Sequence, residues 1–422
     1  MADIINLLSA LPGDHGLARL REKRPQVLEN AQASFEALFE PVDPGSFSFA
    51  ERYAVAAYVS GLHRVANART FYTELLRDDA PDALVDAVDT IIEASLSTGP
   101  YGTYREPGLS GDSEPGGHVL NDKGGLGTRL AAAFDFAHLL VFHPRDSRPE
   151  SIRRLVSAGW SADDVVSLAQ LISFLTFQLR VVHGLQTLAG RDVEVKADDK
   201  ARHPGLAAED VEWELPDRGL FEITTYPDLV RPAAFVNHAL GWKPWVPPVV
   251  RAELTDGQRD ALITPERADM PYFRLLARDP AVLKARTLTD SGIFHNTDGG
   301  LGRAGRELVA LLTSRLNGCV YCAAVHAERT VEEGGDAAVV DKLLDDGLDI
   351  DLGSDRWNVL RDASRTLAFT PMEYNAGCVG KLRAVGLDDA ALLDHLYAVS
   401  FVNWANRLML SLGEPEVPVR FR

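Results

Sequence analysis

The stretch ELVALLTSRLNGCVYCAAVH, residues 307–326, shows how this chain is expected to fold. Apolar residues recur at helical spacing up to Leu316, which predicts a helix. Asn317 and Gly318 predict the end of that helix, because both residue types accept the left-handed backbone that closes one. A second helix is therefore expected to begin at or next to Cys319.

Helical periodicity also dominates the rest of the chain, and strand-like alternation is scarce. The best strand candidates are Val193 to Val195 and Phe221 to Thr225. The segment GWKPWVPP, residues 241–248, is expected to be extended, because its prolines prevent it from being helical. Together these patterns predict an all-α fold.

The composition is that of an ordinary soluble protein, with 46% hydrophobic and 25% charged residues. A length of 422 residues indicates two or three domains. Lys and Arg number 43 against 61 Asp and Glu, which gives a formal charge of −18. Such a charge repels nucleic acid and anionic lipid surfaces, so neither a nucleic acid nor a membrane is expected as a main partner.

The chain has three cysteines, Cys319, Cys322 and Cys378, which are too few for a disulfide framework. A reducing compartment fits this usage best. The N-terminus shows no basic region ahead of an apolar stretch, and polar residues interrupt the most apolar segment, 165–179. We therefore expect a cytoplasmic protein with no signal peptide and no membrane span.

Two parts of the chain resemble each other, which predicts an internal duplication. Residues 137–177 match 364–404 at an offset of 227, and an earlier pair of helices aligns at an offset of 254. The offsets differ by 27 (254 − 227), so the first copy is expected to hold an insertion of that size. The Gly- and Pro-rich run 97–127 is predicted to be this insertion and to form an irregular loop. The matched pairs include Leu155 with Leu382, Gly159 with Gly386, Arg180 with Arg407 and Arg52 with Arg306.

The duplication predicts two domains. A polar segment dotted with Pro and Gly, 196–228, is the expected linker between a first domain, 1–195, and a second domain, 229–422. All three cysteines lie in the second domain, so the first cannot carry dithiol chemistry in any register.

The Cys-x-x-Cys pair is the main candidate for chemistry. Cys319 and Cys322 are expected in the first turn of a helix, where free N–H groups and the helix dipole favour a thiolate. Their spacing puts both sulfurs on one face, within disulfide reach of each other. His326 follows on the same face and can exchange a proton with the thiol of Cys322. Glu307, on the preceding helix, is expected to orient or deprotonate that imidazole.

Two other interpretations of the pair remain open. Zinc would need two further ligands, and Cys378 and His326 are the residues that could supply them. Alternatively, both thiols are small residues of a buried core. A redox-active dithiol is favoured over both.

With Glu307, Cys319, Cys322 and His326 at these spacings, the second domain resembles the AhpD-like alkylhydroperoxidases of the carboxymuconolactone decarboxylase superfamily. It is most similar to the peroxidase-related branch, and the resemblance includes the GWKPWVPP segment. The resemblance implies an all-α, oligomeric protein that reduces organic peroxides. It also implies that Cys322 is the peroxidatic nucleophile, Cys319 the resolving thiol, and His326 with Glu307 the proton relay. Tyr321 departs from the family, which often has histidine just before the second cysteine, so a simpler relay is expected.

The first domain resembles the same superfamily, as a degenerate copy. At the offset of 254, its counterparts of the four site residues are Tyr53, Val65, Ala68 and Tyr72. His63 is expected to be a structural or surface histidine and not a catalytic remnant. Cys378 is expected to be a packing residue, because its counterpart in the first copy is Ser151.

The expected function is that of a thiol-dependent peroxidase in antioxidant defence, which acts on organic hydroperoxides. Its disulfide would be reopened by an external dithiol reductant, such as a lipoyl protein or a thioredoxin-like protein. No metal, flavin or haem cofactor is expected, and a homo-oligomer is. The alternatives are decarboxylation of a carboxylated lactone, as elsewhere in the superfamily, and a redox-sensing scaffold without catalysis.

Overall fold

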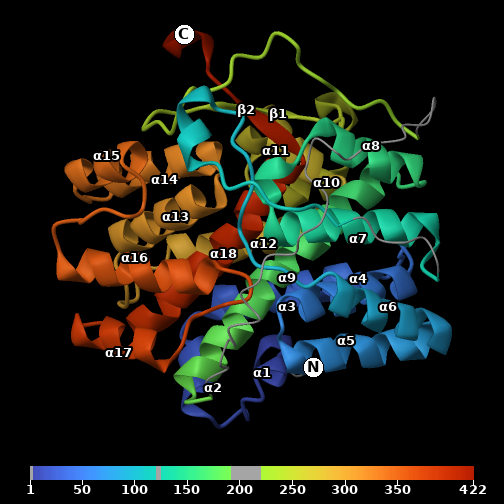
Figure 1. Ribbon diagram of the computed structural model, residues 1–422, viewed down its shortest axis with the longest axis horizontal. Helices are drawn as coiled ribbons and strands as arrows, with labels where there is room; N and C mark the ends of the chain where they lie inside the picture. The colour runs from blue at the N-terminus through green and yellow to red at the C-terminus, as the bar shows by residue number, and fades with distance from the viewer. Residues whose placement is uncertain (1–2, 120–124, 192–219) are drawn as a thin grey trace.

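The computed structural model describes residues 3–119, 125–191 and 220–422, and within these ranges it contains helices and one two-stranded sheet (Figure 1). The predicted all-α class is confirmed. The sheet pairs β1 (Gly241–Pro244) antiparallel with β2 (Gly413–Glu416), and β1 lies in the segment predicted to be extended. The strand predicted at Phe221 to Thr225 is wrong, because this segment is extended but joins no ladder; Val193 to Val195 lies outside the described residues.

In its described residues, the first half begins with two short helices and continues with seven more. The short ones are α1 (Ile4–Leu8) and α2 (Gly16–Glu22). The seven are α3 (Pro25–Phe39), α4 (Phe49–Leu62), α5 (Ala66–Asp79), α6 (Asp82–Ala94), α7 (Gly127–Phe142), α8 (Pro149–Ser157) and α9 (Ala162–Leu188). Two 3-10 turns, η1 (Pro107–Asp112) and η2 (Pro144–Asp146), precede and follow α7.

The second half also ends in seven helices. Before them come β1, η5 (Arg251–Glu253), α10 (Asp256–Ala261), η6 (Pro265–Asp269) and α11 (Pro271–Leu276). The seven are α12 (Pro280–Phe294), α13 (Arg303–Asn317), α14 (Val320–Glu332), α15 (Ala337–Asp345), α16 (Asp355–Ala368), α17 (Ala376–Ala384) and α18 (Asp389–Ser411). The strand β2 and the turn η7 (Val419–Phe421) close the chain.

The two runs of seven helices correspond in order and in position. Helices α4 and α5 begin at positions 49 and 66, and α13 and α14 begin at 303 and 320, an offset of 254 in both cases (303 − 49 and 320 − 66). Helices α8 and α9 begin at 149 and 162, and α17 and α18 begin at 376 and 389, an offset of 227 in both cases (376 − 149 and 389 − 162). Both offsets are those of the sequence comparison, which supports the duplication as a proposal.

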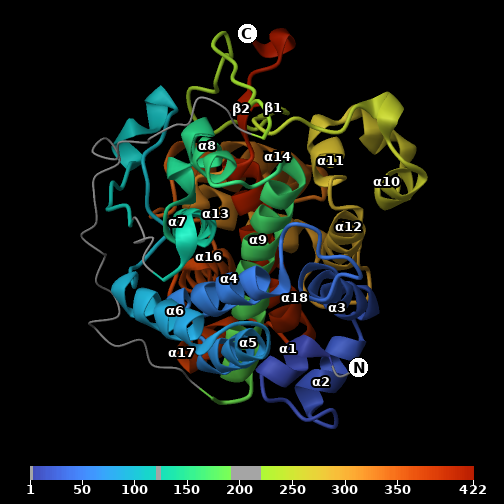
Figure 2. The same cartoon turned by 90° about the vertical axis from the view of Figure 1, so that its right-hand side faces the viewer.

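Helices α9 and α18 pack on each other through the middle of the molecule, and the other helices surround them (Figures 1 and 2). A capping box between Ser161 and Asp164 starts α9, and the side chain of Asp388 caps α18. In the described part of the chain, α9 is the one helix long and apolar enough to cross a membrane, but almost all of it is buried in the fold. This burial is that of a core helix, and the cytoplasmic location stays a prediction.

The predicted linker and loop are described in part. Residues 196–219 of the linker and 120–124 of the loop lie outside the described residues. The described part of the loop forms η1 and two isolated bridges, Gly102 with Glu114 and Gly99 with Thr370. The second of these bridges ties the loop to the other half. The connection between α6 and α7 is longer than that between α15 and α16, which spans only 346–354.

Two buried arginines, one from each half, donate hydrogen bonds to the opposite half; we call this the arginine exchange. Arg180 of α9 donates to the carbonyl oxygen of Ala368 at 2.8 Å, at the end of α16. Arg407 of α18 donates to the carbonyl oxygen of Val141 at 3.2 Å, near the end of α7. The offset of 227 also relates the positions of these two carbonyls (368 − 141). Burial lowers the pKa of both guanidinium groups, that of Arg407 to about 9.

Replacing Arg180 with leucine should destabilise the protein by about 2–4 kcal/mol, because the Ala368 carbonyl would be left buried without a donor. Chemical unfolding followed by circular dichroism measures this. The matched control is Arg153→Leu, which removes a partly exposed arginine paired with Glu150 and should cost less than about 1 kcal/mol. Equal losses in the two variants would contradict the importance of the exchange.

Candidate active site

A helical hairpin made of α13 and α14 positions the dithiol. Helix α13 ends at Asn317, and Gly318 closes it in the left-handed conformation with φ +79°. Cys319 is the N-cap of α14, so the helix end and the helix start predicted from sequence are both present. Gly318 is also required for space, because a Cβ at this position would clash with Cδ of Arg145.

Buried amides fix the end of α13 against α18. The side chain of Asn317 donates to Oδ1 of Asn403 at 3.1 Å and to Oδ1 of Asn406 at 2.9 Å. Asn406 in turn donates to the hydroxyl of Ser314 at 3.1 Å. Because the dithiol follows directly after Asn317, this network holds it at a defined place on the central helix.

Cys319 and Cys322 are joined as a disulfide at the start of α14. The sulfur of Cys319 accepts the backbone N–H of Cys322 at 3.3 Å, as an N-cap side chain does. In the reduced protein the same N–H group and the helix dipole would stabilise a thiolate at this sulfur. Cys319 is 1% exposed and Cys322 5%, so an oxidant or a reductant has to approach through a narrow opening.

His326 and Glu307 form a buried couple beside the dithiol. The Nδ1 of His326 and the Oε2 of Glu307 are 2.6 Å apart, and Arg303 donates to the Oε1 of Glu307 at 2.6 Å. Burial opposes ionisation of Glu307, but the hydrogen bonds from His326 and Arg303 outweigh it and lower its pKa to about 2. Glu307 is therefore a carboxylate at neutral pH, and it accepts a hydrogen bond from the protonated Nδ1 of His326.

This contact leaves the Nε2 of His326 for proton exchange with a reacting group. The imidazole stacks on Phe294 of α12 with ring centroids 5.5 Å apart, which fixes its plane. Within the described ranges, no hydrogen bond joins His326 to either sulfur. His326 and Cys322 lie four residues apart on α14, so proton exchange between them stays a prediction. All four predicted site residues lie in this hairpin.

A small cavity of about 30 Å³ adjoins the dithiol at Cys319. Tyr321 also lines this cavity, whereas Cys322 and His326 do not. Burial raises the pKa of the Tyr321 phenol, so it stays protonated at neutral pH. The remaining wall comes from distant parts of the chain: Thr103, Tyr104, Arg105, Glu106, Arg145, Ser147, Arg231, Trp242, Trp245, Gly318, Val320, Met409, Leu410, Gly413 and Pro415.

Most charges in the cavity wall are paired with one another. Glu414 lies behind the wall and binds both Arg231 and Arg105, the latter at 3.1 Å. Arg231 also meets Glu106 at 3.3 Å. Arg145 is the exception: within the described residues, no carboxylate lies within ion-pair distance of it. The first half therefore places a cation in the same cavity as Cys319, where it favours a thiolate.

The first half has no counterpart of this chemistry. Val65, the counterpart of Cys319, is the N-cap of α5 but makes no side-chain cap bond. The hydroxyl of Tyr72, the counterpart of His326, donates to Gln178 at 2.6 Å. His63 is buried and holds the carbonyl of Val59 and the guanidinium of Arg180, which is the structural role expected of it.

Comparison with known families gives one match. Residues 280–362, from α12 into α16, match the carboxymuconolactone decarboxylase family. The matched segment contains Glu307, Cys319, Cys322 and His326, so it supports the superfamily that the sequence resembles. No curated protein matches the chain. The duplication and the degenerate first copy stay predictions.

Two features of the site were missed from the sequence. Arg303 stands four residues before Glu307 on one helix, a spacing that predicts an ion pair and could have been found. The cavity wall could not have been found, because Arg145 and residues 103–106 reach the dithiol only through the packing of the two halves.

Glu307→Gln should change how the free energy of unfolding depends on pH. A carboxyl group whose pKa is lowered in the folded state stabilises the protein above its ordinary pKa, near 4.5, and this contribution is lost as pH falls toward 2. Between pH 5 and pH 2 the wild-type protein should therefore lose up to about 3 kcal/mol more unfolding free energy than the variant. Urea unfolding at a series of pH values measures the difference. If the unfolding free energies of the two proteins changed equally with pH, the lowered pKa of Glu307 would be contradicted.

Gly318→Ala should destabilise the hairpin by about 2–4 kcal/mol, because the new methyl group meets Arg145 in addition to the strained backbone. Gly334→Ala is the matched control. Gly334 also has a positive φ, +87°, but nothing lies within 4 Å of the added Cβ, so only about 1 kcal/mol should be lost. Denaturant unfolding compares the two. A loss at residue 318 no larger than the control's would show that Arg145 does not press on the turn.

Proposed function

We propose that this protein is a thiol-dependent peroxidase that reduces organic hydroperoxides through a Cys319–Cys322 cycle. The observation that carries the proposal is the His326–Glu307 couple, one helical turn beyond a cysteine pair at a helix N-terminus. Lactone decarboxylation, the reaction in the name of the matched family, makes no use of a dithiol.

The cycle needs two thiols and one peroxide. The thiolate of Cys322 attacks one oxygen of the O–O bond, which breaks to give a sulfenic acid on Cys322 and an alkoxide. His326 supplies the proton that turns the alkoxide into an alcohol, and Glu307 stabilises the charged imidazole meanwhile. The thiol of Cys319 then condenses with the sulfenic acid, forming the disulfide and releasing water. An external dithiol reduces the disulfide and is itself oxidised.

The groups around Cys319 favour a neutral hydroperoxide over a charged one, and the small cavity has to widen to admit it. The charged groups of the cavity are mostly paired with each other, and Trp242, Trp245 and Met409 add apolar surface. Arg145 supplies a positive charge near the dithiol, which would help to keep a thiolate at neutral pH. Residues 103–106 of the predicted insertion form part of the wall, so this loop would influence which peroxides enter.

We propose that residues 1–195 are a copy without dithiol chemistry, that 229–422 are the peroxidase domain, and that the protein forms a homo-oligomer in the cytoplasm. The reductant is a dithiol protein, lipoyl-bearing or thioredoxin-like. A redox-sensing scaffold is the non-enzymatic alternative: it would form the same disulfide without turnover.

Single cysteine variants test the proposal. Cys322→Ser should abolish peroxide consumption in the presence of a dithiol donor. Cys319→Ser should leave a sulfenic acid on Cys322 that a trapping reagent and mass spectrometry detect. Cys378→Ser is the matched control, because Cys378 is half-buried on α17, away from the site, and its loss should change nothing. His326→Ala should slow oxidation by about 10²–10⁴-fold.

Three other results would change or refute the proposed cycle. A sulfenic acid trapped on Cys319 in the Cys322→Ser protein, together with continued peroxide consumption, would reverse the roles of the two thiols. One round of oxidation without turnover would favour the redox scaffold. Consumption that persists without both thiols would refute the dithiol cycle.

A further inference from the structure

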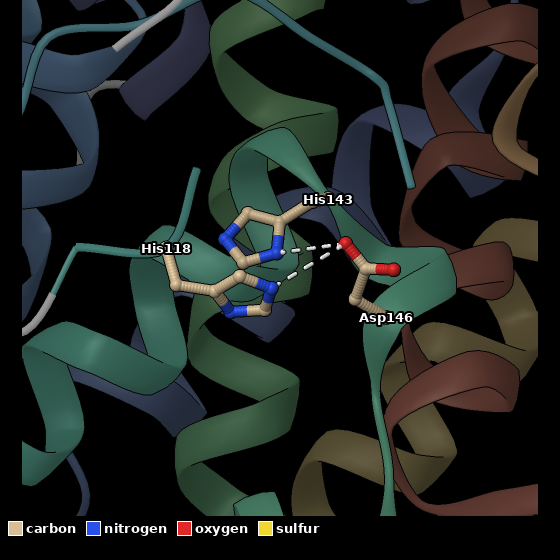
Figure 3. A group of neighbouring side chains, drawn as sticks. All are labelled: His118, His143 and Asp146. Atoms are coloured by element: carbon tan, nitrogen blue, oxygen red, sulfur yellow. Dashed lines mark ion pairs between the residues drawn. The ribbon is translucent and has the colours of Figure 1, made fainter. Parts of the chain in front are cut away.

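A second cluster of side chains that can bind a ligand lies in the first half, around the end of α7 and η2. His143 caps the end of α7, Asp146 belongs to η2, and His118 comes from the loop before α7. Their side chains point toward one another, and both imidazoles face the same carboxylate oxygen (Figure 3). The Nδ1 of His143 lies 3.4 Å and the Nε2 of His118 lies 3.8 Å from Oδ2 of Asp146.

All three residues are buried, with exposed fractions of 9% for His118, 2% for His143 and 8% for Asp146. Neither of the two ring nitrogens that face Asp146 makes a well-formed hydrogen bond. The three atoms are thus paired only at the long distances of 3.4 and 3.8 Å, and a bound cation would replace these by short bonds to all three. The three donor atoms all lie within 4.8 Å of one another.

The spacing fits a metal ion. Donor atoms at about 2.0–2.2 Å from a tetrahedral ion stand roughly 3.4 Å apart, close to the two distances to Oδ2. Imidazole and carboxylate are ligands for Zn²⁺ and Fe²⁺, and two histidines with one carboxylate are typical of sites with open positions.

Neighbouring groups orient the three side chains as the surroundings of metal ligands usually do. The other oxygen of Asp146, Oδ1, accepts the backbone N–H of Thr103 at 2.8 Å. The other nitrogen of His143, Nε2, meets Nδ1 of His138 at 3.1 Å. Tyr101 stacks on the ring of His143 with centroids 5.0 Å apart and planes at 5°. Such contacts fix the tautomer and the ring plane of a metal-binding histidine.

The group opens into a cavity of its own, with a volume of about 310 Å³. This cavity is lined by His118, His143 and Asp146 and by residues of α7 and α8, among them Phe136, Leu139 and Ser151. Arg148 is also in the wall, where it donates to the carbonyl oxygens of Arg145 and Ser147. A bound ion would therefore keep open positions facing a space large enough for a small molecule.

We propose that His118, His143 and Asp146 bind a divalent transition-metal ion, Zn²⁺ or Fe²⁺, through Nε2, Nδ1 and Oδ2 respectively. The remaining positions of the ion face the cavity and take water or an oxygen-bearing small molecule. The site belongs to the first half alone, because at the offset of 227 Thr370 and Glu373 stand at the positions of His143 and Asp146. No metal was expected from the sequence, and this site differs from that expectation.

Metal titration of the full chain tests the proposal. Protein without an affinity tag is stripped with a chelator and titrated with Zn²⁺ by calorimetry and with Co²⁺ by visible absorption. The wild-type chain should bind about one ion with Co²⁺ bands typical of a low-coordinate site. His118→Ala and Asp146→Asn should each weaken binding by about 100-fold or more.

Two controls make the result specific. A reduced cysteine pair can itself hold zinc, so binding at the dithiol has to be excluded. If the ion sits at the His–Asp group, the double variant Cys319→Ser/Cys322→Ser should bind as the wild type does. His238→Ala, a partly exposed histidine far along the chain, should also leave binding unchanged. Circular dichroism checks that each variant is folded. Absence of binding in the wild type, unchanged binding in both His118→Ala and Asp146→Asn, or loss of binding in the double cysteine variant would overturn the proposal.

Discussion

The exchange of Arg180 and Arg407 between the halves is the constraint on which the other features depend. Each guanidinium is fully buried on a central helix and reaches a carbonyl near the end of a helix in the opposite half. Arg407 thereby holds the end of α7, and His143, Arg145 and Asp146 follow directly after that point. Loss of this register would displace the cation beside Cys319 and the His–Asp group together.

The dithiol site was predictable because its geometry is local. Glu307, Cys319, Cys322 and His326 lie within one hairpin, and helical spacing with a glycine at the turn is enough to bring them together. The cavity was not predictable, because its wall joins Thr103, Arg145 and Arg231 through long-range packing. The same reason accounts for the wrong strand at 221–225: its composition suits an extended chain, but one backbone bond, from Thr224 to Trp245, is all that the described residues show in place of a ladder.

The first half contributes more to the dithiol than its lack of cysteine suggests. Arg145 packs on the Gly318 turn and residues 103–106 line the cavity, so the site is built from both halves. His118, which completes the His–Asp group, comes from the same loop that supplies residues 103–106. The segment predicted as an insertion therefore borders two cavities, and the helices around it hold it in place.

The exchanged arginines also set an order of events during synthesis. When the first half leaves the ribosome, Arg180 has no Ala368 carbonyl to bind, and the carbonyl of Val141 has no Arg407. We expect both polar groups to stay hydrated until nearly the whole chain has been made. The first half should therefore complete its packing only after Arg407, which follows Arg180 by 227 residues (407 − 180), has been synthesised.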